Sequence, residues 1–463
     1  MTLRQAHRWL ARHVVFPIKD IVTRKRTLEA LTELERTQWL PRDALRDLQW
    51  LRLQQVLRHA CDTVPYYQRV FSERGVRPSD VTDWKAFSEL VPILTKDLVQ
   101  QHGLALRSTR PGPSPMMART SGSTGRPTLV WGDWSSRSYY NASGVRGRRW
   151  WDIDVGSTEL KFWGVSTSFE TSLWGKALSV LRRVKDVALG VVHVSAFDMS
   201  YSRLMAHYRL MVRWRPELLF GYGTALYIFA EFIKRNSLSL DGYHPRVVIY
   251  TSEMLYPSQK QVIQDVFGAP LVSEYGCVEL GVLGYECPHR KMHLSEEIAY
   301  FEIVNQRMYD DSCTGELVVT GLVNQSFPLI RYKLGDIVQF SQSDTVCACG
   351  RQLAVLDKLI GRSNDLVRKP SGEYIHPELF DYVMRYQSGV RRYRIIEKDV
   401  GYLEVQLEMS GELHPAQRDD LRRGLEKSIG EDVTFEITSV PRLESDPSGK
   451  FRWVVSRAEA NMS

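Results

Sequence analysis

The chain is 463 residues long, with 43% hydrophobic and 25% charged residues, a composition typical of folded globular proteins. These proportions exclude a disordered chain, a collagen and a coiled coil. The 61 basic and 54 acidic residues leave a formal net charge of +7, which over this length is too dilute for a dedicated nucleic-acid-binding protein. No stretch approaches the roughly 18 consecutive apolar residues of a membrane-spanning helix.

The N-terminal stretch is basic and interrupted by charges, without the apolar core of a secretory signal. We therefore expect a cytoplasmic protein whose six cysteines are reduced and free to bind metal. The same stretch permits two interpretations, the solvated face of a helix or an amphipathic helix that touches anionic lipid. Its charged residues are Arg4, Arg8, Arg12, Lys19, Arg24, Lys25 and Arg26, against Asp20 and Glu29.

The first clear element is an amphipathic helix over 48–61, where apolar residues recur at helical spacing. Between about 155 and 340, short apolar runs alternate with helical patterns, which predicts a largely parallel sheet covered by helices on both faces. Helices are expected around 204–212 and 226–233. The expected strands are Leu160–Val165, Ala188–Val194, Val247–Tyr250, Pro270–Val272 and Leu317–Thr320.

The pattern changes after about residue 360. Apolar and polar residues alternate over 403–409, which predicts a half-buried strand, and a helix over 415–429 and a strand over 433–440 follow. We therefore predict an α/β protein with a large N-terminal domain of mixed or parallel sheets and helices, and a small α+β C-terminal domain. The expected boundaries are 1–360, including a basic helical extension at 1–45, and 361–463.

The most informative segment is TSGSTGRPT at 120–128, which is rich in hydroxyl residues and glycines. Glycines let the backbone approach a ligand closely, and hydroxyl and N–H groups can surround phosphate oxygens. The segment lacks the lysine of a Walker loop. By itself it indicates either a phosphate-binding loop or a flexible loop.

Five further motifs follow this loop in a fixed order. Together with it they resemble the adenylate-forming superfamily of acyl-CoA synthetases, and within it the phenylacetate–CoA ligase family and its relatives encoded with capsular polysaccharide genes. The resemblance extends from about residue 48 to the end of the chain. The motifs are TSEML (251–255), SEYGCVELG (273–281), RYKLGDIV (331–338), IGRSNDLV (360–367) and PRLESDPSGKFR (441–452).

The resemblance implies an enzyme that joins a carboxylate to the α-phosphate of ATP with Mg²⁺, releases pyrophosphate, and passes the acyl group to a thiol, which we expect to be that of CoA. It also implies that the large domain binds ATP and acid while the small domain acts as a mobile lid. Both steps move negative charge between oxygens, so the protein must mainly position and stabilise the reacting groups.

The same resemblance assigns roles to individual residues. Lys450, Glu279 and Thr124 are the expected catalytic residues, with Glu279 and Thr124 holding magnesium through oxygen ligands. Asn364 and Asp365 are the expected hinge. The expected ATP-binding residues are Ser121, Gly122, Ser123, Thr124, Gly125, Ser252, Glu253, Met254, Tyr275, Gly276, Asp336 and Arg362.

Cysteine and histidine residues form a second group. Cys347 and Cys349 are spaced C-x-C, and Cys287 precedes both His289 and His293. Three thiolates and one imidazole would make a closed tetrahedral zinc site, while the alternative is unrelated reduced thiols on loops. The spacing resembles a metal cluster of some phenylacetate–CoA ligase relatives, and this favours His293 over His289.

Aromatic residues mark a candidate acyl pocket. Trp163 and Gly164 end one expected strand, and Tyr222 and Gly223 follow another. Ligands of open α/β sheets bind beyond the carboxyl ends of the strands, so these residues are expected to wall a pocket for an aryl or other small acid. The family's usual aryl-pocket segment is replaced by GVSTSFETSLWGK, which puts phenylacetate itself in doubt.

The leading hypothesis is thus an ATP-dependent acid–thiol ligase, either a monomer or a homodimer. An alternative keeps adenylation but delivers the acyl group to an amine, a hydroxyl or a carrier protein in polysaccharide or natural-product synthesis. A third reading, a zinc-dependent nucleic-acid-binding protein, lacks any finger-type C-x2-C pair.

Overall fold

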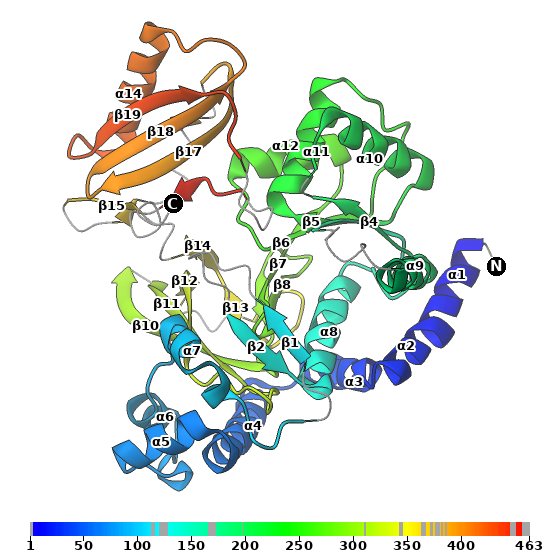
Figure 1. The fold of residues 1–463 in the computed structure, drawn as a ribbon, viewed down its shortest axis with the longest axis vertical. Helices are drawn as coiled ribbons and strands as arrows, with labels where there is room; N and C mark the ends of the chain where they lie inside the picture. The colour runs from blue at the N-terminus through cyan, green and yellow to red at the C-terminus, as the bar shows by residue number, and fades with distance from the viewer. Residues whose placement is uncertain are drawn as a thin grey trace.

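The computed structural model describes residues 3–112, 116–119, 128–164, 173–196, 198–309, 312–341, 346–362, 367–370, 374–375, 380, 383–384, 387–444 and 451–455. Within these ranges no helix is long and apolar enough to cross a membrane. The predicted mixed α/β fold is confirmed, with a separate group of C-terminal elements beside the larger body (Figure 1).

The N-terminal quarter of the chain is helical. A nearly continuous rod of α1, η1 and α2 lies along one side of the body and α3 follows at its lower end, while α4 to α7 lie at the lower left of the view, away from the rod (Figure 1). The helix expected over 48–61 lies within α4. The bounds are α1 Leu3–Leu10, η1 Ala11–Val15, α2 Phe16–Val22, α3 Thr27–Thr37, α4 Arg42–Thr63, α5 Pro65–Arg74, η2 Pro78–Asp80, α6 Trp84–Leu90, α7 Lys96–His102 and η3 Gly103–Leu106.

An eight-stranded mixed sheet forms the centre of the body, in the order β13-β9-β8-β7-β6-β5-β3-β4. Neighbours from β4 to β7 are parallel, whereas β8, β9 and β13 continue antiparallel. Its strands are β3 Glu159–Trp163, β4 Val191–Ser195, β5 Leu218–Tyr222, β6 Val247–Thr251, β7 Leu271–Cys277, β8 Gly281–Glu286, β9 Met292–Leu294 and β13 Val355–Leu356.

Helices cover both faces of this sheet, as a parallel sheet requires. One face packs against α10 and α11, where Leu160, Leu219, Phe229 and Val248 are buried together. The other face carries Phe220, Ile249 and Val272 and is covered by α8. The bounds are α8 Trp134–Arg149, α9 Leu173–Ala188, α10 Tyr201–Trp214, α11 Gly223–Arg235 and α12 Pro257–Phe267.

A second, antiparallel sheet lies beside the first, in the order β10-β11-β12-β14. The strand expected at Leu317–Thr320 belongs here and not to the parallel sheet, because β11 pairs antiparallel with both neighbours. A short ribbon of two strands precedes α8. The bounds are β1 Met116–Arg119, β2 Leu129–Gly132, β10 Ala299–Tyr309, β11 Ser312–Gly321, β12 Tyr332–Ser341 and β14 Lys358–Arg362.

The C-terminal elements have a core of their own. The alternating pattern predicted β18, whose buried residues Leu403, Val405 and Leu407 face the helix α14. The four-stranded sheet has the order β19-β18-β17-β20. The bounds are β15 Val367–Arg368, β16 Tyr374–Ile375, β17 Val390–Asp399, β18 Tyr402–Met409, α14 Pro415–Ile429, β19 Thr434–Val440 and β20 Val454–Val455.

Candidate active site and metal centre

Three of the predicted nucleotide-binding residues meet where the two large sheets approach each other. Tyr275, near the end of β7, is buried and donates a 2.6 Å hydrogen bond from its hydroxyl to the carboxylate of Asp336 on β12. Asp336 in turn pairs in register with Arg362 on β14. Tyr275 and Asp336, 61 positions apart in the chain, are thus brought together by a side-chain hydrogen bond between strands of two different sheets.

The segment that follows β6 lies beside this group. Ser252 adopts a left-handed backbone with φ of 69°, which turns the chain sharply after the strand. The next residue, Glu253, accepts a 2.7 Å hydrogen bond from the backbone N–H of Thr224 at the start of α11. A Cβ built on Gly361 of β14 would lie 3.6 Å from the Met254 sulfur. The predicted adenine-lining segment therefore contacts the strand that carries Arg362.

The turn between β7 and β8 requires glycine and holds Glu279. A Cβ on Gly276 would lie 2.5 Å from the backbone oxygen of Gly281, so no larger residue fits this tight hairpin. The backbone carbonyl of Glu279 accepts a long hydrogen bond, 3.5 Å, from the Tyr140 hydroxyl. Glu279 is half-buried and lies two residues beyond the end of β7.

Several predicted residues lie outside the described part of the chain. They are Ser121, Gly122, Ser123, Thr124, Gly125, Asn364, Asp365 and Lys450, and for Arg362 only the backbone is described. The segment directly after Lys450 is described: the Trp453 ring lies 5.9 Å from the ring of Tyr256, two residues beyond Met254. The C-terminal sheet thus contacts the body next to the nucleotide segment.

The aromatic residues predicted to wall the acyl pocket come together. Trp163 and Tyr222, at the ends of the neighbouring strands β3 and β5, have ring centroids 4.5 Å apart. Gly164 directly follows Trp163, and a Cβ on Gly223 would lie 3.0 Å from Leu255. A cavity of about 430 Å³ extends from Trp163 along the face of the sheet beneath α8.

This cavity is lined by charged residues that the sequence did not single out. The Lys161 ammonium lies 4.7 Å from the ring centroid of Trp163 and 4.9 Å from that of Phe220, and Glu274 lines the same cavity. Burial lowers the pKa of Lys161 and raises the pKa of Glu274. Deeper in the cavity, Arg148 and Glu159 form a 2.8 Å ion pair.

One sequence signal could have revealed this polar wall. Glu159, Lys161 and Trp163 occupy alternate positions of β3, so they face the same side. Charged residues at two alternate positions of a buried parallel strand are unexpected for a purely structural face. They indicate a lined cavity instead.

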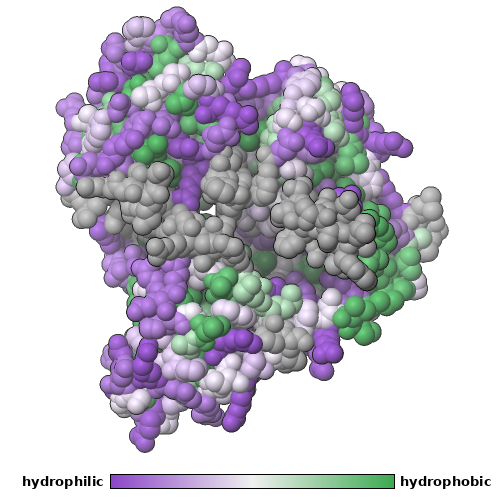
Figure 2. Space-filling model, viewed as in Figure 1, coloured by the Kyte–Doolittle hydropathy of each residue, from purple (hydrophilic) through white to green (hydrophobic). Residues whose placement is uncertain are grey.

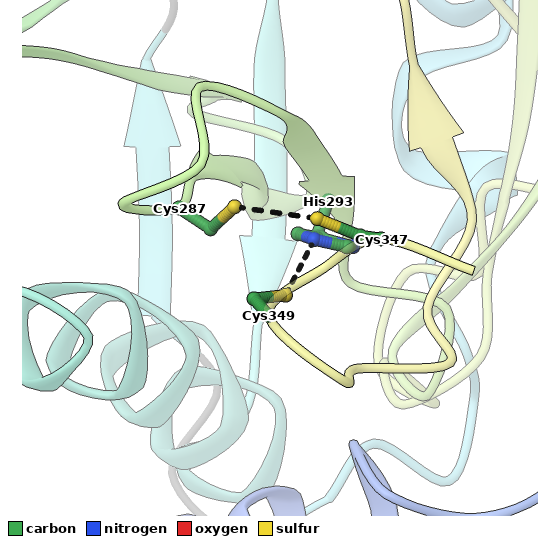
Figure 3. A group of neighbouring side chains, drawn as sticks. All are labelled: Cys287, His293, Cys347 and Cys349. Carbon is green, nitrogen blue, oxygen red and sulfur yellow. Dashed lines mark hydrogen bonds between the residues drawn. The ribbon is translucent and has the colours of Figure 1, made fainter. Parts of the chain in front are cut away.

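The predicted metal ligands form a compact cluster (Figure 3). The ligand atoms of Cys287, His293, Cys347 and Cys349 all lie within 4.8 Å of one another. The Cys287 and Cys347 sulfurs are 3.8 Å apart, and the Cys349 sulfur lies 3.2 Å from Nε2 of His293. His289 is exposed and is not part of this cluster, so the geometry selects His293.

The protonation states within the cluster suit a metal ligand set. Nδ1 of His293 donates a 3.0 Å hydrogen bond to the Leu353 carbonyl, which leaves Nε2 facing the thiols. Burial lowers the pKa of His293 to about 4, so the imidazole is neutral at pH 7. Burial also raises the pKa of Cys287 to about 12. A buried thiol of this kind ionises most readily when a cation binds beside it.

Comparison with solved structures identifies the fold of the chain. The chain has the fold of the adenylate-forming CoA ligases: it superposes on 2-hydroxyisobutyryl-CoA ligase in the postadenylation state with a TM-score of 0.71 and 19% identity, over 92% of this chain and 93% of that one. The thioesterification state of the same ligase gives a TM-score of 0.58. The fold that the motif resemblance implies is thereby confirmed.

The sequence is similar to those of a phenylacetate–CoA ligase and a CapK protein. The chain is 24% identical over 461 residues to phenylacetate–coenzyme A ligase of Aromatoleum evansii, covering 92% of this chain and 97% of that enzyme. It is 22% identical over 298 residues to Protein CapK of Staphylococcus aureus, covering 62% of this chain and 64% of CapK, slightly less than two thirds of its length. Residues 367–457 match the CapK C-terminal domain.

Proposed function

We propose that this protein is an ATP-dependent acid–CoA ligase. The observation that carries the proposal is the meeting of Tyr275, Asp336 and Arg362 beside the 252–254 segment. We propose that this group binds the nucleotide and that the cavity that begins at Trp163 receives the acid. A carboxylate oxygen of the acid attacks the α-phosphorus of ATP and pyrophosphate leaves. A thiolate then attacks the acyl carbonyl and AMP leaves.

The chain's own residues orient and neutralise these groups. Asp336, fixed by Tyr275, can accept hydrogen bonds from two ribose hydroxyls. The loop at 120–128 is proposed to hold the β- and γ-phosphates through its backbone N–H and hydroxyl groups. Glu279 and Thr124 would hold Mg²⁺, which supplies positive charge to the phosphate oxygens when it is bound. Lys450 is proposed to stabilise the charge that develops on the transferring phosphate.

Separate measurement of the two half-reactions, adenylation and acyl transfer, tests this proposal. Lys450→Ala should lower ATP-dependent pyrophosphate release about 10²–10³-fold, because one electrostatic contact to the transition state is lost. The same variant should still convert a supplied acyl-adenylate to the thioester. The exposed Lys427→Ala serves as the control. Undiminished pyrophosphate release by the Lys450 variant would remove this lysine from the mechanism.

A second candidate function differs from the first in the molecule that accepts the acyl group. Because contacts to CoA are diffuse in such enzymes, the motifs also fit an enzyme that passes the acyl group to an amine, a hydroxyl or a carrier protein. Pyrophosphate release should be measured over a panel of acids with CoA, with amines and without an acceptor. Product that forms only with an amine would replace the CoA proposal while keeping adenylation.

We further propose that the acid is polar and small. The cavity has room for a compact acyl group, and Glu274 and Lys161 offer it a hydrogen-bond acceptor and a donor. A hydroxy- or amino-substituted acid can hydrogen-bond to both groups, whereas the ring of phenylacetate can bond to neither and would displace water from them, which is costly in a buried site. Lys161→Met should shift the preference toward apolar acids in the pyrophosphate assay. A preference for phenylacetate in the unmodified protein would refute this assignment.

Zinc is the metal that the Cys287, His293, Cys347 and Cys349 set fits best. Three thiolates and one imidazole leave no open position in a tetrahedral site, so the metal would be structural. It would join the end of β8 and β9 to the residues before β13 and thereby brace the hairpin that follows Glu279. We propose that no step of the reaction takes place at this site.

A further inference from the structure

A broad apolar patch covers one side of the molecule. It is formed by the helical rod of α1, η1 and α2 together with α9, and Figure 2 shows the apolar side chains gathered there. In α2, Ile18, Ile21 and Val22 are 54%, 76% and 75% exposed. The remaining exposed apolar members of the patch are Trp9, Leu10, Val180, Leu181, Val184 and Val187.

The apolar residues form two stripes on neighbouring helices. Val180, Leu181, Val184 and Val187 recur at the spacing that places residues on one face of a helix. α9 lies against the rod at η1. A soluble surface rarely exposes so many large aliphatic residues together, and such patches mark interaction sites.

The rod is held on the body by its inner side, which leaves the apolar side free. Arg8 pairs with Glu217 at 2.5 Å and Arg12 with Asp154 at 3.0 Å. Phe16 of α2 is buried and lines the cavity on the face of the sheet. The exposed aliphatic residues therefore do not belong to a loosely attached helix whose packing is incomplete. They lie on a helix whose position is already fixed.

Positive charge is concentrated on the same two segments. Residues 3–26 and 173–190 carry eleven Lys and Arg against two Asp, a net charge of +9, while the whole chain carries +7. The rest of the chain is therefore slightly acidic, at −2. With Arg8, Arg12 and Arg26 neutralised by their ion-pair partners, the two segments still keep an excess of six positive charges.

We propose that this patch docks the protein on an anionic membrane surface. Aliphatic and Trp side chains flanked by Lys and Arg are the composition of helices that lie in the lipid interface. Each basic residue near an anionic leaflet contributes about 1 kcal/mol to binding. A second copy of this chain would bring two strongly positive surfaces together, so charge disfavours self-association through the patch.

Vesicle flotation of the full-length protein tests the proposal. We expect binding to vesicles of phosphatidylcholine mixed with phosphatidylserine, none to phosphatidylcholine alone, and release by salt as screening increases. Arg24→Gln/Lys25→Gln should weaken binding about thirtyfold, as expected for two lost charges. Ile18→Ser/Ile21→Ser/Val184→Ser should abolish it. The control is Leu104→Ser, because Leu104 is 67% exposed but lies in η3 outside the patch.

Unchanged Tm values will show that the variants are folded. Equal binding to neutral and anionic vesicles, or no binding to either, would overturn the proposal. So would a concentration-dependent dimer, detected by sedimentation, that the triple serine variant dissolves while vesicle binding is absent. That result would assign the patch to a second copy.

Discussion

The hydroxyl of Tyr275 donates a 2.6 Å hydrogen bond to the carboxylate of Asp336, and this bond links the central mixed sheet to the antiparallel sheet. Tyr275 is 8% exposed, so little water can replace the bond if it is lost. The contact fixes the rotamer of a carboxylate that we propose binds ribose. Its strength should therefore appear in the affinity for ATP.

Tyr275→Phe removes the hydroxyl that donates this bond and keeps the ring. Hydrogen bonds to charged groups are worth about 1.5–3 kcal/mol, so the KM for ATP should rise at least tenfold, with a smaller change in kcat at saturating ATP. Steady-state pyrophosphate release measures both constants. Tyr402→Phe is a matched control, because Tyr402 makes a 2.6 Å bond to Glu436 on the exposed surface of the C-terminal sheet. An unchanged KM in Tyr275→Phe would remove Asp336 from ATP binding.

A buried ion pair should matter more for stability than for activity. The side chains of Arg146 on α8 and Glu297 are 2% and 0% exposed and form a 2.6 Å pair, with Thr37 also donating to Glu297. Arg146→Met leaves an uncompensated buried carboxylate and should lower the free energy of unfolding by about 3–5 kcal/mol. Urea denaturation measures this loss.

A surface pair provides the comparison for Arg146. Lys85 and Glu89 lie 4.0 Å apart with side chains 82% and 63% exposed. Lys85→Met should change the unfolding free energy by less than about 1 kcal/mol. Similar losses in the two variants would show that the Arg146–Glu297 pair is not the anchor of α8.

The metal cluster predicts a stoichiometric zinc. Purified protein should carry about one zinc per chain, and Cys349→Ser should lose the metal and lower the Tm together, because a closed site contributes to folding. Elemental analysis and a thermal melt measure the two effects. Cys61→Ser should keep the metal, since Cys61 lies in the helix α4 away from the cluster. Metal retained at full occupancy by Cys347→Ser/Cys349→Ser would show that the ligands are others.

Sequence reasoning succeeded where the local pattern of residues is enough to predict the structure. The alternation around Leu403 and the apolar residues at helical spacing in α14 predicted both elements closely. The four candidate metal ligands were predicted from their spacing together with the family resemblance, which favoured His293, and the structure brings His293 into the cluster and leaves His289 outside it. Local patterns of this kind need no knowledge of distant partners.

Sequence reasoning failed where partners lie far apart in the chain. The sequence places Leu317–Thr320 in the parallel sheet, because an apolar strand has the same residue pattern in a parallel and in an antiparallel sheet. Its pairing with β10 and β12 shows that it belongs to the antiparallel sheet. Lys161 and Glu274 were missed for a similar reason. The cavity that both residues line is formed by strands more than 100 residues apart in the chain, so the charged positions of β3 and β7 have no visible connection in the sequence.

The attachment of the N-terminal rod should depend on pH. Burial by itself raises the pKa of Glu217, but hydrogen bonds from Arg8 and from the Thr158 backbone hold it below its ordinary value of 4.5 overall. The stabilisation is therefore complete above about pH 4.5 and is lost as the pH falls through the lower folded value. Because Arg8 is partly exposed, we expect a contribution of about 1 kcal/mol.

Comparison of variants isolates this effect from other carboxylates. At pH 7, Glu217→Gln should unfold at lower urea than the unmodified protein, and the difference should disappear as the pH falls through the lowered pKa of Glu217 in the folded protein. Glu73→Gln, in an exposed pair with Arg69 at 3.8 Å, should show no such difference at either pH. A gap for Glu217→Gln that persists in acid would mean that the carboxylate charge is not what holds the rod.

The last prediction concerns the connection between the body and the C-terminal sheet. β14 ends at Arg362 within the body and β15 begins at Val367, so the short segment containing Asn364 and Asp365 joins them. Tyr256 packs into the C-terminal core against Trp453, and thiol attack on the acyl-adenylate needs room beside this contact. We propose that the C-terminal sheet turns about Asn364 between the two half-reactions. Asn364→Pro fixes φ near −65°, so pyrophosphate release should survive while thioester formation falls by at least about tenfold, whereas Asn364→Gly, which leaves φ free, should support both. Both half-reactions intact in the proline variant would show that rotation about residue 364 is not required.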